Sequence, residues 1–139
     1  MRIVLDANVL VAGVRSRTGA SNPLLIAGFK GRFAWGCSVP LFYEYEDVLN
    51  RAEFLLATGI PRSEIATFLT DVAGTVEPVE LRFSWRPQLR DAGDEMVLET
   101  AINARADVLV TQDMKDFGAA PGRFGIDCLT PADALRRIA

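Results

Sequence analysis

Arg2-Ile3-Val4-Leu5-Asp6-Ala7-Asn8 is the stretch of sequence that decides the fold. Residues 3–5 form a short apolar run rich in β-branched side chains, which predicts a buried strand of a parallel sheet. The run stops at the carboxylate of Asp6, and the apolar residues 9–12 predict a turn of helix. Ligands of open α/β sheets bind at the carboxyl ends of the strands, so Asp6 is a candidate site residue. Capping of the following helix by Asp6 or Asn8 is an equally favoured role.

Beyond this stretch, short apolar runs alternate with amphipathic segments. Further strands are expected at residues 33–39, 74–79, 108–110 and 126–129, and helices at residues 23–30, 40–51, 54–56, 63–73 and 94–105 and from residue 131. The expected N-caps are Ser21 or Asn22, Ser38, Ser63 and Thr130. This alternation predicts a single α/β domain over residues 1–139, a three-layer sandwich with a mainly parallel central sheet flanked by helices.

The composition excludes several classes of protein. Half of the residues are hydrophobic, and no apolar run approaches the roughly 20 residues of a membrane helix. The N-terminus has no signal-sequence pattern, so a soluble, cytoplasmic protein is expected. Cys37 and Cys128 are expected to be buried free thiols in a reducing compartment. The absence of histidine excludes histidine bases, histidine metal sites and Ser-His-Asp triads.

The charged residues carry a strong bias toward arginine. The net charge is -3, so bulk charge does not make the chain a binder of nucleic acid. Of the 15 basic residues, only Lys30 and Lys115 are lysines. Arginine binds phosphates through two hydrogen bonds and stacks on bases. An arginine-rich, GC-rich genome would produce the same bias without any function.

Four acids occupy positions where apolar or neutral loop residues are expected. Asp6 and Asp113 follow buried strands, whereas Glu44 and Asp94 fall within the core-facing stripes of two helices. An unpaired buried carboxylate costs several kcal/mol and must be neutralised. With no histidine and two lysines, arginines alone are poorly suited to pair all four. A divalent cation does so directly, and clustered carboxylates favour Mg²⁺ or Mn²⁺.

Each acid also has a purely structural interpretation. Glu44 can extend to the rim of its helix, Asp94 can be an N-cap, and Asp113 can be a turn residue. For Asp91, capping or turning the loop is the favoured role, and Glu95 and Glu99 are expected on the outer side of their helix. The supporting residues that would orient ligands or water are Asn8, Thr111 and Asp116.

Four motifs in order resemble those of the PIN-domain ribonuclease family. They read LDANVL at residues 5–10, SVPLFYEYEDVL at 38–49, DAGDEMVLETA at 91–101 and ADVLVTQDMKDF at 106–117. They span nearly the whole chain and are most similar to bacterial toxin components of toxin–antitoxin pairs, the VapC-like proteins. Each motif is weak alone, and the four in succession are specific.

The resemblance implies a PIN-like sheet with an acidic pocket at its carboxyl edge and Mg²⁺- or Mn²⁺-dependent endonucleolytic cleavage of RNA. It assigns the family's four acids to Asp6, Glu44, Asp94 and Asp113, with Asn8 and Thr111 as supporting residues. Asp91, Asp94 and Glu95 compete for the third acidic position, and Asp116 is a second candidate for the fourth. It also implies a homodimer and, in toxin pairs, a small antitoxin that fills the pocket.

Two surfaces are candidates for contacts with partners. Phe54, Leu55, Leu56, Phe83 and Trp85 are candidates for an interface, although a place in the core is the favoured interpretation. Arg15, Arg17 and Lys115 lie in expected loops where they can face RNA phosphates, and plain solvated charge is equally favoured.

Two other functions compete with the nuclease. A non-catalytic module with the same acidic metal pocket would bind RNA or a partner without cleaving it. A phosphoryl-transfer protein needs a nucleophilic aspartate with a second acid close behind it, but Asn8 stands in that place. The nuclease is therefore the favoured function.

Overall fold

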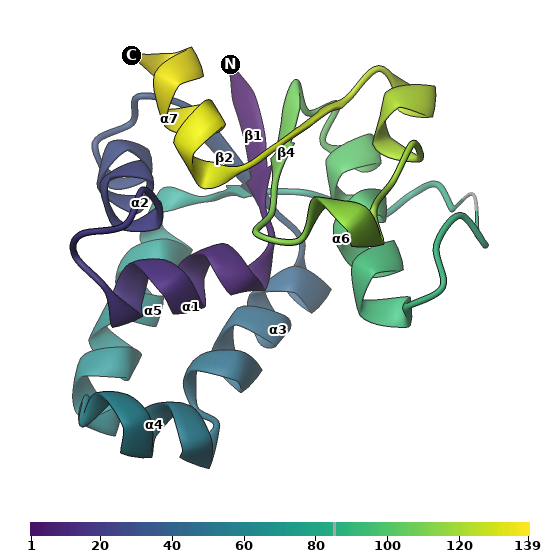
Figure 1. The fold of residues 1–139 in the computed structure, drawn as a ribbon. Coiled ribbons are helices and arrows are strands. Elements are labelled where there is room, and N and C mark those ends of the chain that lie inside the picture. Colours follow the sequence, from purple (N-terminus) through teal and green to yellow (C-terminus); the bar gives the residue numbers. More distant parts are fainter. Residues whose placement is uncertain (85) are drawn as a thin grey trace.

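A computed structural model describes residues 1–84 and 86–139 and contains a five-stranded sheet (Figure 1). The strands lie in the order β3 (Glu77–Pro78), β2 (Ala34–Cys37), β1 (Arg2–Leu5), β4 (Val108–Val110) and β5 (Asp127–Leu129). Every neighbouring pair is parallel. Ile3 pairs with Trp35 on one side and Val108 on the other, so β1 lies at the centre.

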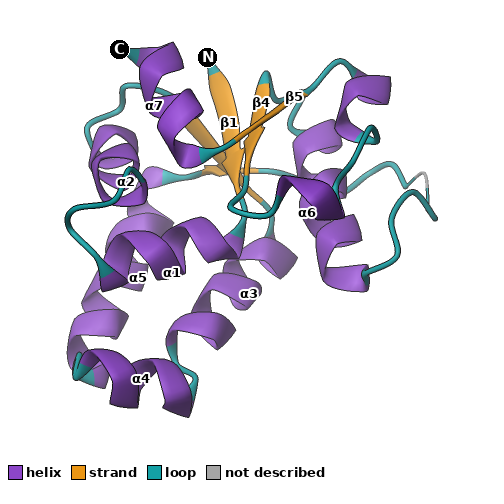
Figure 2. Ribbon diagram, in the orientation of Figure 1, coloured by secondary structure: helices purple, strands orange, loops and turns teal. Residues whose placement is uncertain are grey.

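Seven α-helices flank this sheet in the described part of the chain (Figure 2). They are α1 (Ala7–Arg15), α2 (Ser21–Phe29), α3 (Val39–Leu49), α4 (Ala52–Thr58), α5 (Arg62–Thr75), α6 (Ala92–Asn103) and α7 (Pro131–Ile138). Two 3-10 turns, η1 (Met114–Asp116) and η2 (Pro121–Phe124), follow β4. The predicted α/β sandwich with a parallel central sheet is confirmed. In Figure 1, α3 and α4 extend beyond the edge of the sheet at which β1 ends.

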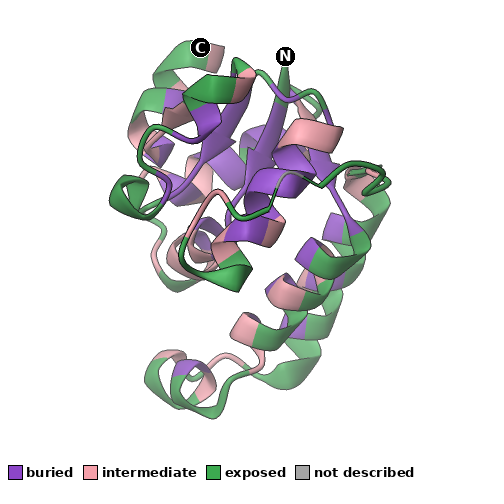
Figure 3. Cartoon of the chain, turned by 90° about the vertical axis from the view of Figure 1, so that its right-hand side faces the viewer, coloured by how far each residue is buried: buried purple, intermediate pink, exposed green. Residues whose placement is uncertain are grey.

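The central strands are buried because both of their faces are covered by helices. Ile3, Val4 and Leu5 have no exposed surface, nor do the three residues of β4 (Figure 3). A continuous apolar run is the pattern that such a strand requires. The polar residues therefore begin where these central strands end, and the site can form only there.

Two of the predicted helix caps are confirmed. The Ser38 hydroxyl accepts a hydrogen bond from the Leu41 backbone N–H at 3.3 Å, at the start of α3. The Thr130 hydroxyl accepts one from the Asp133 backbone N–H at 3.2 Å, at the start of α7. Both helices have proline in the first turn, where its missing N–H costs no hydrogen bond.

Two other predicted caps are wrong. The N-cap of α2 is Ala20, and the side chain of Asn22 instead donates to the Gly13 carbonyl at 3.0 Å. The N-cap of α5 is Pro61, whose extended backbone starts the helix before Ser63. The α5 helix also runs on to Thr75, so the strand expected at residues 74–79 shortens to the two residues of β3.

Helix α6 departs most from its predicted pattern. Glu95 and Glu99, expected on its outer side, are 5% and 7% exposed. The helix also begins at Ala92, earlier than expected, whereas the capping role favoured for Asp91 is confirmed. The cause lies in the segment before the helix, where Arg86 and the Leu89 backbone N–H supply polar partners to the two carboxylates.

The candidate interface residues do not form one patch among the described residues. Phe54 is buried, as the core interpretation predicts, whereas Leu56 and Phe83 are exposed. Helix α4 and the segment around residue 83 lie in separate parts of Figure 1. Trp85 lies outside the described residues.

Two further expectations concern the thiols and the membrane. Cys37 and Cys128 are free thiols, as predicted, with Cys37 buried and Cys128 half-buried. None of the helices in residues 1–84 and 86–139 is long and apolar enough to cross a membrane.

Candidate active site

The ends of β1 and β4 are joined by a network around the Thr111 hydroxyl. Its oxygen accepts hydrogen bonds from the Asn8 side-chain amide at 3.2 Å and from the Asp113 backbone N–H at 3.1 Å. Its single proton is therefore free for Asp6, whose Oδ2 lies 2.8 Å away. The Asn8 carbonyl oxygen in turn accepts a hydrogen bond from the Gln112 backbone N–H at 3.1 Å. Two of the three predicted supporting residues, Asn8 and Thr111, thus belong to one hydrogen-bond network with Asp6.

Asp6 does not cap the following helix. It occupies the N-cap position of α1, but its side chain makes no capping hydrogen bond. It is 9% exposed, and this burial raises its pKa, an effect to which the nearby charges of Glu44 and Asp116 add. The Thr111 hydroxyl offsets only part of this rise. A buried carboxylate that other acids surround favours either a proton or a cation.

Glu44 is held near Asp6 by its neighbour in the sequence. The Tyr45 hydroxyl donates to the carbonyl of Leu5 at 2.5 Å, which ties α3 to the end of β1. Glu44 itself is 38% exposed in its side chain, so it lies at the rim rather than facing the core as predicted. Its carboxylate is 3.9 Å from the Arg51 guanidinium, which has a closer partner in Asp47 at 2.9 Å. Glu44 is therefore only weakly neutralised.

Asp94 lies in the first turn of α6 and is not the cap of that helix. The cap is Asp91, whose Oδ1 accepts hydrogen bonds from the backbone N–H groups of Gly93 and Asp94 at 2.8 and 3.1 Å. Asp94 is half-buried, and its pKa is raised to about 6. Burial is the main cause, followed by the charges of Asp6, Asp91, Asp116 and Asp113. Asp94 therefore stands within electrostatic reach of the strand-end acids.

Asp113 and Asp116 lie at the exposed side of this acidic group. Both side chains are accessible to solvent, in and beside the turn η1. A hydrogen bond that the protonated Asp116 carboxyl group donates to Asp113 raises the pKa of Asp116, and the negative charge of Asp113 adds to the rise. Two carboxyl groups can share such a bond only when one of them holds a proton, so this pair also favours a cation at neutral pH.

Two cavities meet at Asp94. One, of about 620 Å³, is lined by Asp6, Asn8, Glu44 and Asp94, together with Arg15 and Arg51. The other, of about 590 Å³, is lined by Asp94, Asp116 and Lys115 and by parts of residues 87–91. Arg17, a predicted phosphate contact, lines a different groove beside α2. The acidic cavity is the natural place for a cation and a phosphate.

The sequence was compared with known proteins. A family model of the PIN domain matches residues 2–115. The chain belongs to the PIN domain family. PIN domains are generally nucleases that act on RNA, and they typically use divalent metals, so the chain carries a nuclease-type domain. A search of curated proteins gave no match.

The carboxylates of this PIN domain have the donor chemistry of a hard-cation site. Within residues 1–84 and 86–139, Asp6, Asp94 and Asp113 form no ion pair with arginine or lysine. Oxygen ligands of this kind suit Mg²⁺ and Mn²⁺. In the same described ranges, no three acidic or cysteine side chains are gathered closely enough to hold a metal ion. The carboxylates must therefore come closer together before three of them can share a cation.

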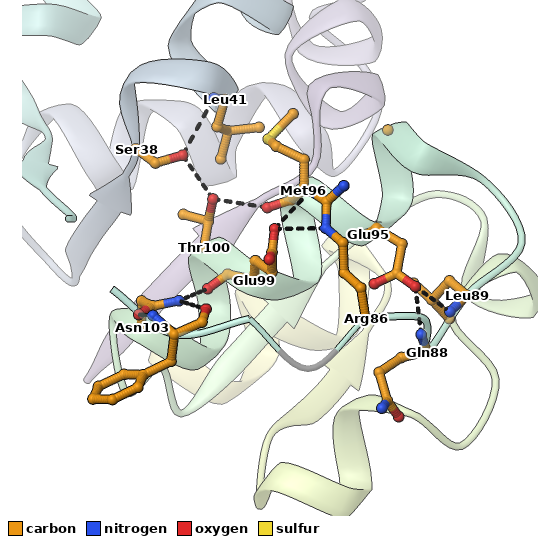
Figure 4. Close-up of polar contacts among 12 residues, drawn as sticks. Ser38, Leu41, Arg86, Gln88, Leu89, Glu95, Met96, Glu99, Thr100 and Asn103 are labelled. Carbon is orange, nitrogen blue, oxygen red and sulfur yellow. Dashed lines mark hydrogen bonds and ion pairs between the residues drawn. The ribbon is translucent and has the colours of Figure 1, made fainter. Parts of the chain in front are cut away.

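Sequence reasoning missed the residues that hold Asp94 in place. Glu99 pairs with Arg86, whose Nε and Nη2 both donate to Oε2, at 3.1 and 2.6 Å (Figure 4). Glu95 accepts hydrogen bonds from the backbone N–H groups of Gln88 and Leu89. Neither acid is thus open to a metal. Helical periodicity carries no signal for these contacts, because both acids lie beside the apolar stripe of α6 and their partners precede the helix without a repeating pattern.

Asn103 extends the same set of contacts by one more turn of α6. Its side-chain oxygen accepts hydrogen bonds from the backbone N–H groups of Arg82 and Phe83, both at 3.0 Å. The Ser38 and Thr100 hydroxyls lie 2.7 Å apart on the neighbouring face and join α3 to α6 (Figure 4). Helix α6 is thereby fixed on two sides, and with it the position of Asp94.

Proposed function

We propose that this PIN domain is a Mg²⁺- or Mn²⁺-dependent endoribonuclease whose metal ligands are Asp6, Glu44, Asp94 and Asp113. The observation that carries the proposal is the buried Asp6 carboxylate, which has a hydroxyl as its side-chain hydrogen-bond donor and is repelled by Glu44 and Asp116. The raised pKa of Asp94 adds support, because such a group favours a ligand that neutralises its charge.

The protein's own residues position the ligands. Thr111 directs its proton to Asp6, Asn8 holds the Thr111 oxygen, and Asp116 lies close to Asp113 on the exposed side of the acidic group. A bound divalent cation supplies Lewis acidity, which activates water and stabilises the charge that builds on the phosphate. Arg15, which lines the acidic cavity, is placed to contact a neighbouring RNA phosphate.

We further propose that the protein acts in the cytoplasm as the toxin of a toxin–antitoxin pair. The support is the resemblance of its four motifs to bacterial toxin components. The proposed role requires two partners: a second copy of the chain in a homodimer, and a small antitoxin protein that fills the acidic cavity. Copurification of a neighbouring gene product, together with the mass of the free protein measured by light scattering, tests both partners. A monomer that binds no such product would contradict this role.

A non-catalytic module that binds RNA or a partner is the second candidate. One observation favours it: in the described residues, the acids are not gathered closely enough to hold a metal as they stand. The two candidates predict different products, because a binding module leaves RNA intact at every metal concentration.

The decisive assay incubates the purified protein with total RNA in the presence of Mn²⁺, Mg²⁺ or a chelator. The nuclease proposal predicts internal cleavage with either metal and none with the chelator. Intact RNA under all three conditions, with RNA retained on the protein, would establish the binding module instead.

A further inference from the structure

We propose that the cavity between residues 87–91 and residues 115–120 binds the RNA nucleotide next to the cleaved phosphate. This inference rests on the proposed nuclease function and deepens it, because it defines a substrate-binding site beside the acidic centre. The cavity contains no proposed metal ligand other than Asp94, which it shares with the acidic cavity. When one phosphate of an RNA strand lies among the acids, the adjacent nucleotide therefore enters this cavity.

The charge along the cavity suits a polyanion. Arg90, Lys115 and Arg123 all line it. None of the three forms an ion pair with an acid in residues 1–84 and 86–139. The Arg123 side chain donates a hydrogen bond of 3.2 Å to the amide oxygen of Gln88. Guanidinium groups with open donors bind phosphates through two parallel hydrogen bonds.

The acids that line the same cavity do not cancel this charge. Asp94 is a proposed ligand of the cation, and Asp116 stands beside another ligand, Asp113. The third acid, Asp91, uses its Oδ1 to cap α6. With a cation bound at the acidic centre, the three basic side chains determine the sign of the remaining charge.

The size and lining of the cavity suit a base as well as a phosphate. Its volume of about 590 Å³ lies within the range of small-ligand sites. Pro87, Leu89 and Ala119 supply apolar surface on which a base can pack. The wall formed by Gln88 and Leu89 is already ordered, because their backbone N–H groups are held by Glu95 (Figure 4). A preformed wall reduces the entropic cost of binding.

The test measures RNA binding separately from cleavage. All variants are made in an Asp6→Asn background, and binding of a fluorescent single-stranded RNA of about 12 nucleotides is followed by anisotropy with Mg²⁺ present. The test variant combines Arg90→Ala, Lys115→Ala and Arg123→Ala. Its matched control combines Arg32→Ala, Arg62→Ala and Lys30→Ala, which removes the same number of arginines and lysines from exposed positions elsewhere. Thermal unfolding verifies that both triple variants fold.

We expect the test variant to bind RNA at least about tenfold more weakly and to show a smaller salt dependence, whereas the control changes affinity by less than about twofold. A second variant, Ala119→Leu, fills the cavity without changing the charge. It should weaken binding and leave the salt dependence as it was. Equal affinities for the test variant and its control would overturn the proposal, as would undiminished binding by Ala119→Leu.

The outcome is independent of whether the protein cleaves RNA. If the protein lacking the Asp6 substitution cleaves and the test triple leaves both kcat and KM unchanged, the nucleotide site is wrong and the nuclease stands. If no cleavage occurs with any metal but the test triple still loses RNA binding, the nuclease is wrong and the site stands.

Discussion

The Thr111 hydroxyl donates a hydrogen bond of 2.8 Å to Oδ2 of Asp6, and this bond joins residues 105 positions apart in the sequence. It exists because β1 and β4 are adjacent and parallel, with Leu5 paired to Val110, so that each strand delivers its next residue to the same edge. The Asn8 amide and the Asp113 backbone N–H occupy the acceptor positions of the hydroxyl. The direction of its proton is therefore set by the fold.

Replacement of Thr111 by valine should damage both stability and activity. The change keeps the shape and leaves buried polar groups without a partner, which costs about 1–3 kcal/mol in the free energy of unfolding. RNA cleavage should fall by about 10–100-fold, since Asp6 loses the group that orients it. Urea unfolding and a cleavage assay measure the two effects. Thr67→Val is the control, because the exposed Thr67 hydroxyl donates to the Ser63 carbonyl within its own helix, α5. Equal behaviour of the two variants would contradict the assigned role.

The fold and the strand-end part of the site could be predicted from the sequence. Continuous apolar runs identify β1 and β4, and parallel strands direct their ends to one edge, so Asp6 and the residues around Asp113 had to be neighbours. Glu44 was predicted to face the core but lies at the rim. The sequence pattern of α3 places Glu44 on the same face of the helix as Leu41 and Val48. It does not determine how deeply that face is buried at Glu44.

The environment of α6 could not be predicted, because it depends on an irregular segment. Glu95 and Glu99 are charged and lie beside the apolar stripe, so periodicity places them in solvent. Their burial depends on Arg86, Gln88 and Leu89, which precede the helix without any repeating pattern. A contact between a loop and a helix leaves no periodic signal in the sequence.

Removing Arg86 from its ion pair with Glu99 should cost much more stability than removing the charge of Glu99. Arg86→Met leaves the buried carboxylate of Glu99 without its cation and should cost about 3 kcal/mol, whereas Glu99→Gln lets the half-exposed Arg86 return to water and should cost about 1 kcal/mol. The pKa of Glu99 is lowered, since the Arg86 and Ser84 hydrogen bonds outweigh its burial, so this contribution disappears when the pH falls through that pKa. Denaturant unfolding measures both variants. Arg82→Met, in an exposed pair with Glu80, serves as the control and should cost less than about 0.5 kcal/mol. Equal costs for Arg86→Met and Arg82→Met would refute the asymmetry.

Neutralisation of Asp94 should stabilise the metal-free protein. Burial and neighbouring acids raise its pKa from 3.8 to about 6, so the charged form is held at a cost near neutral pH. Asp94→Asn removes that cost and should gain about 1 kcal/mol after allowance for solvent screening. The same variant should lose most of its RNA cleavage. Thermal unfolding in a chelator provides the measurement, with the exposed Asp71→Asn on α5 as its counterpart. A loss of stability in Asp94→Asn would show that the carboxylate is not strained by its neighbours.

The pH dependence of metal stabilisation follows from the same groups. A carboxyl group with a raised pKa contributes stability fully below its unfolded pKa, near 3.8 for Asp94, and loses that contribution as the pH rises through about 6. The metal-free protein should therefore lose stability between about pH 4 and pH 6, and its Tm should respond to Mn²⁺ more at about pH 7 than at about pH 5. Melting curves at both pH values, with and without Mn²⁺, test this. A metal response that is the same at both would rule out a site built from Asp6 and Asp94.

The most direct measurement is the rate of RNA cleavage by Asp6→Asn at saturating Mn²⁺, compared with the unmodified protein. The substitution removes one charge, preserves the shape of the side chain and leaves an acceptor for the Thr111 hydroxyl, so the fold should survive and its thermal unfolding provides the check. We predict that cleavage falls by at least about a thousandfold while the folded state remains intact. A folded Asp6→Asn protein that cleaves RNA at the original rate would contradict the assignment of this acidic cavity as the active site.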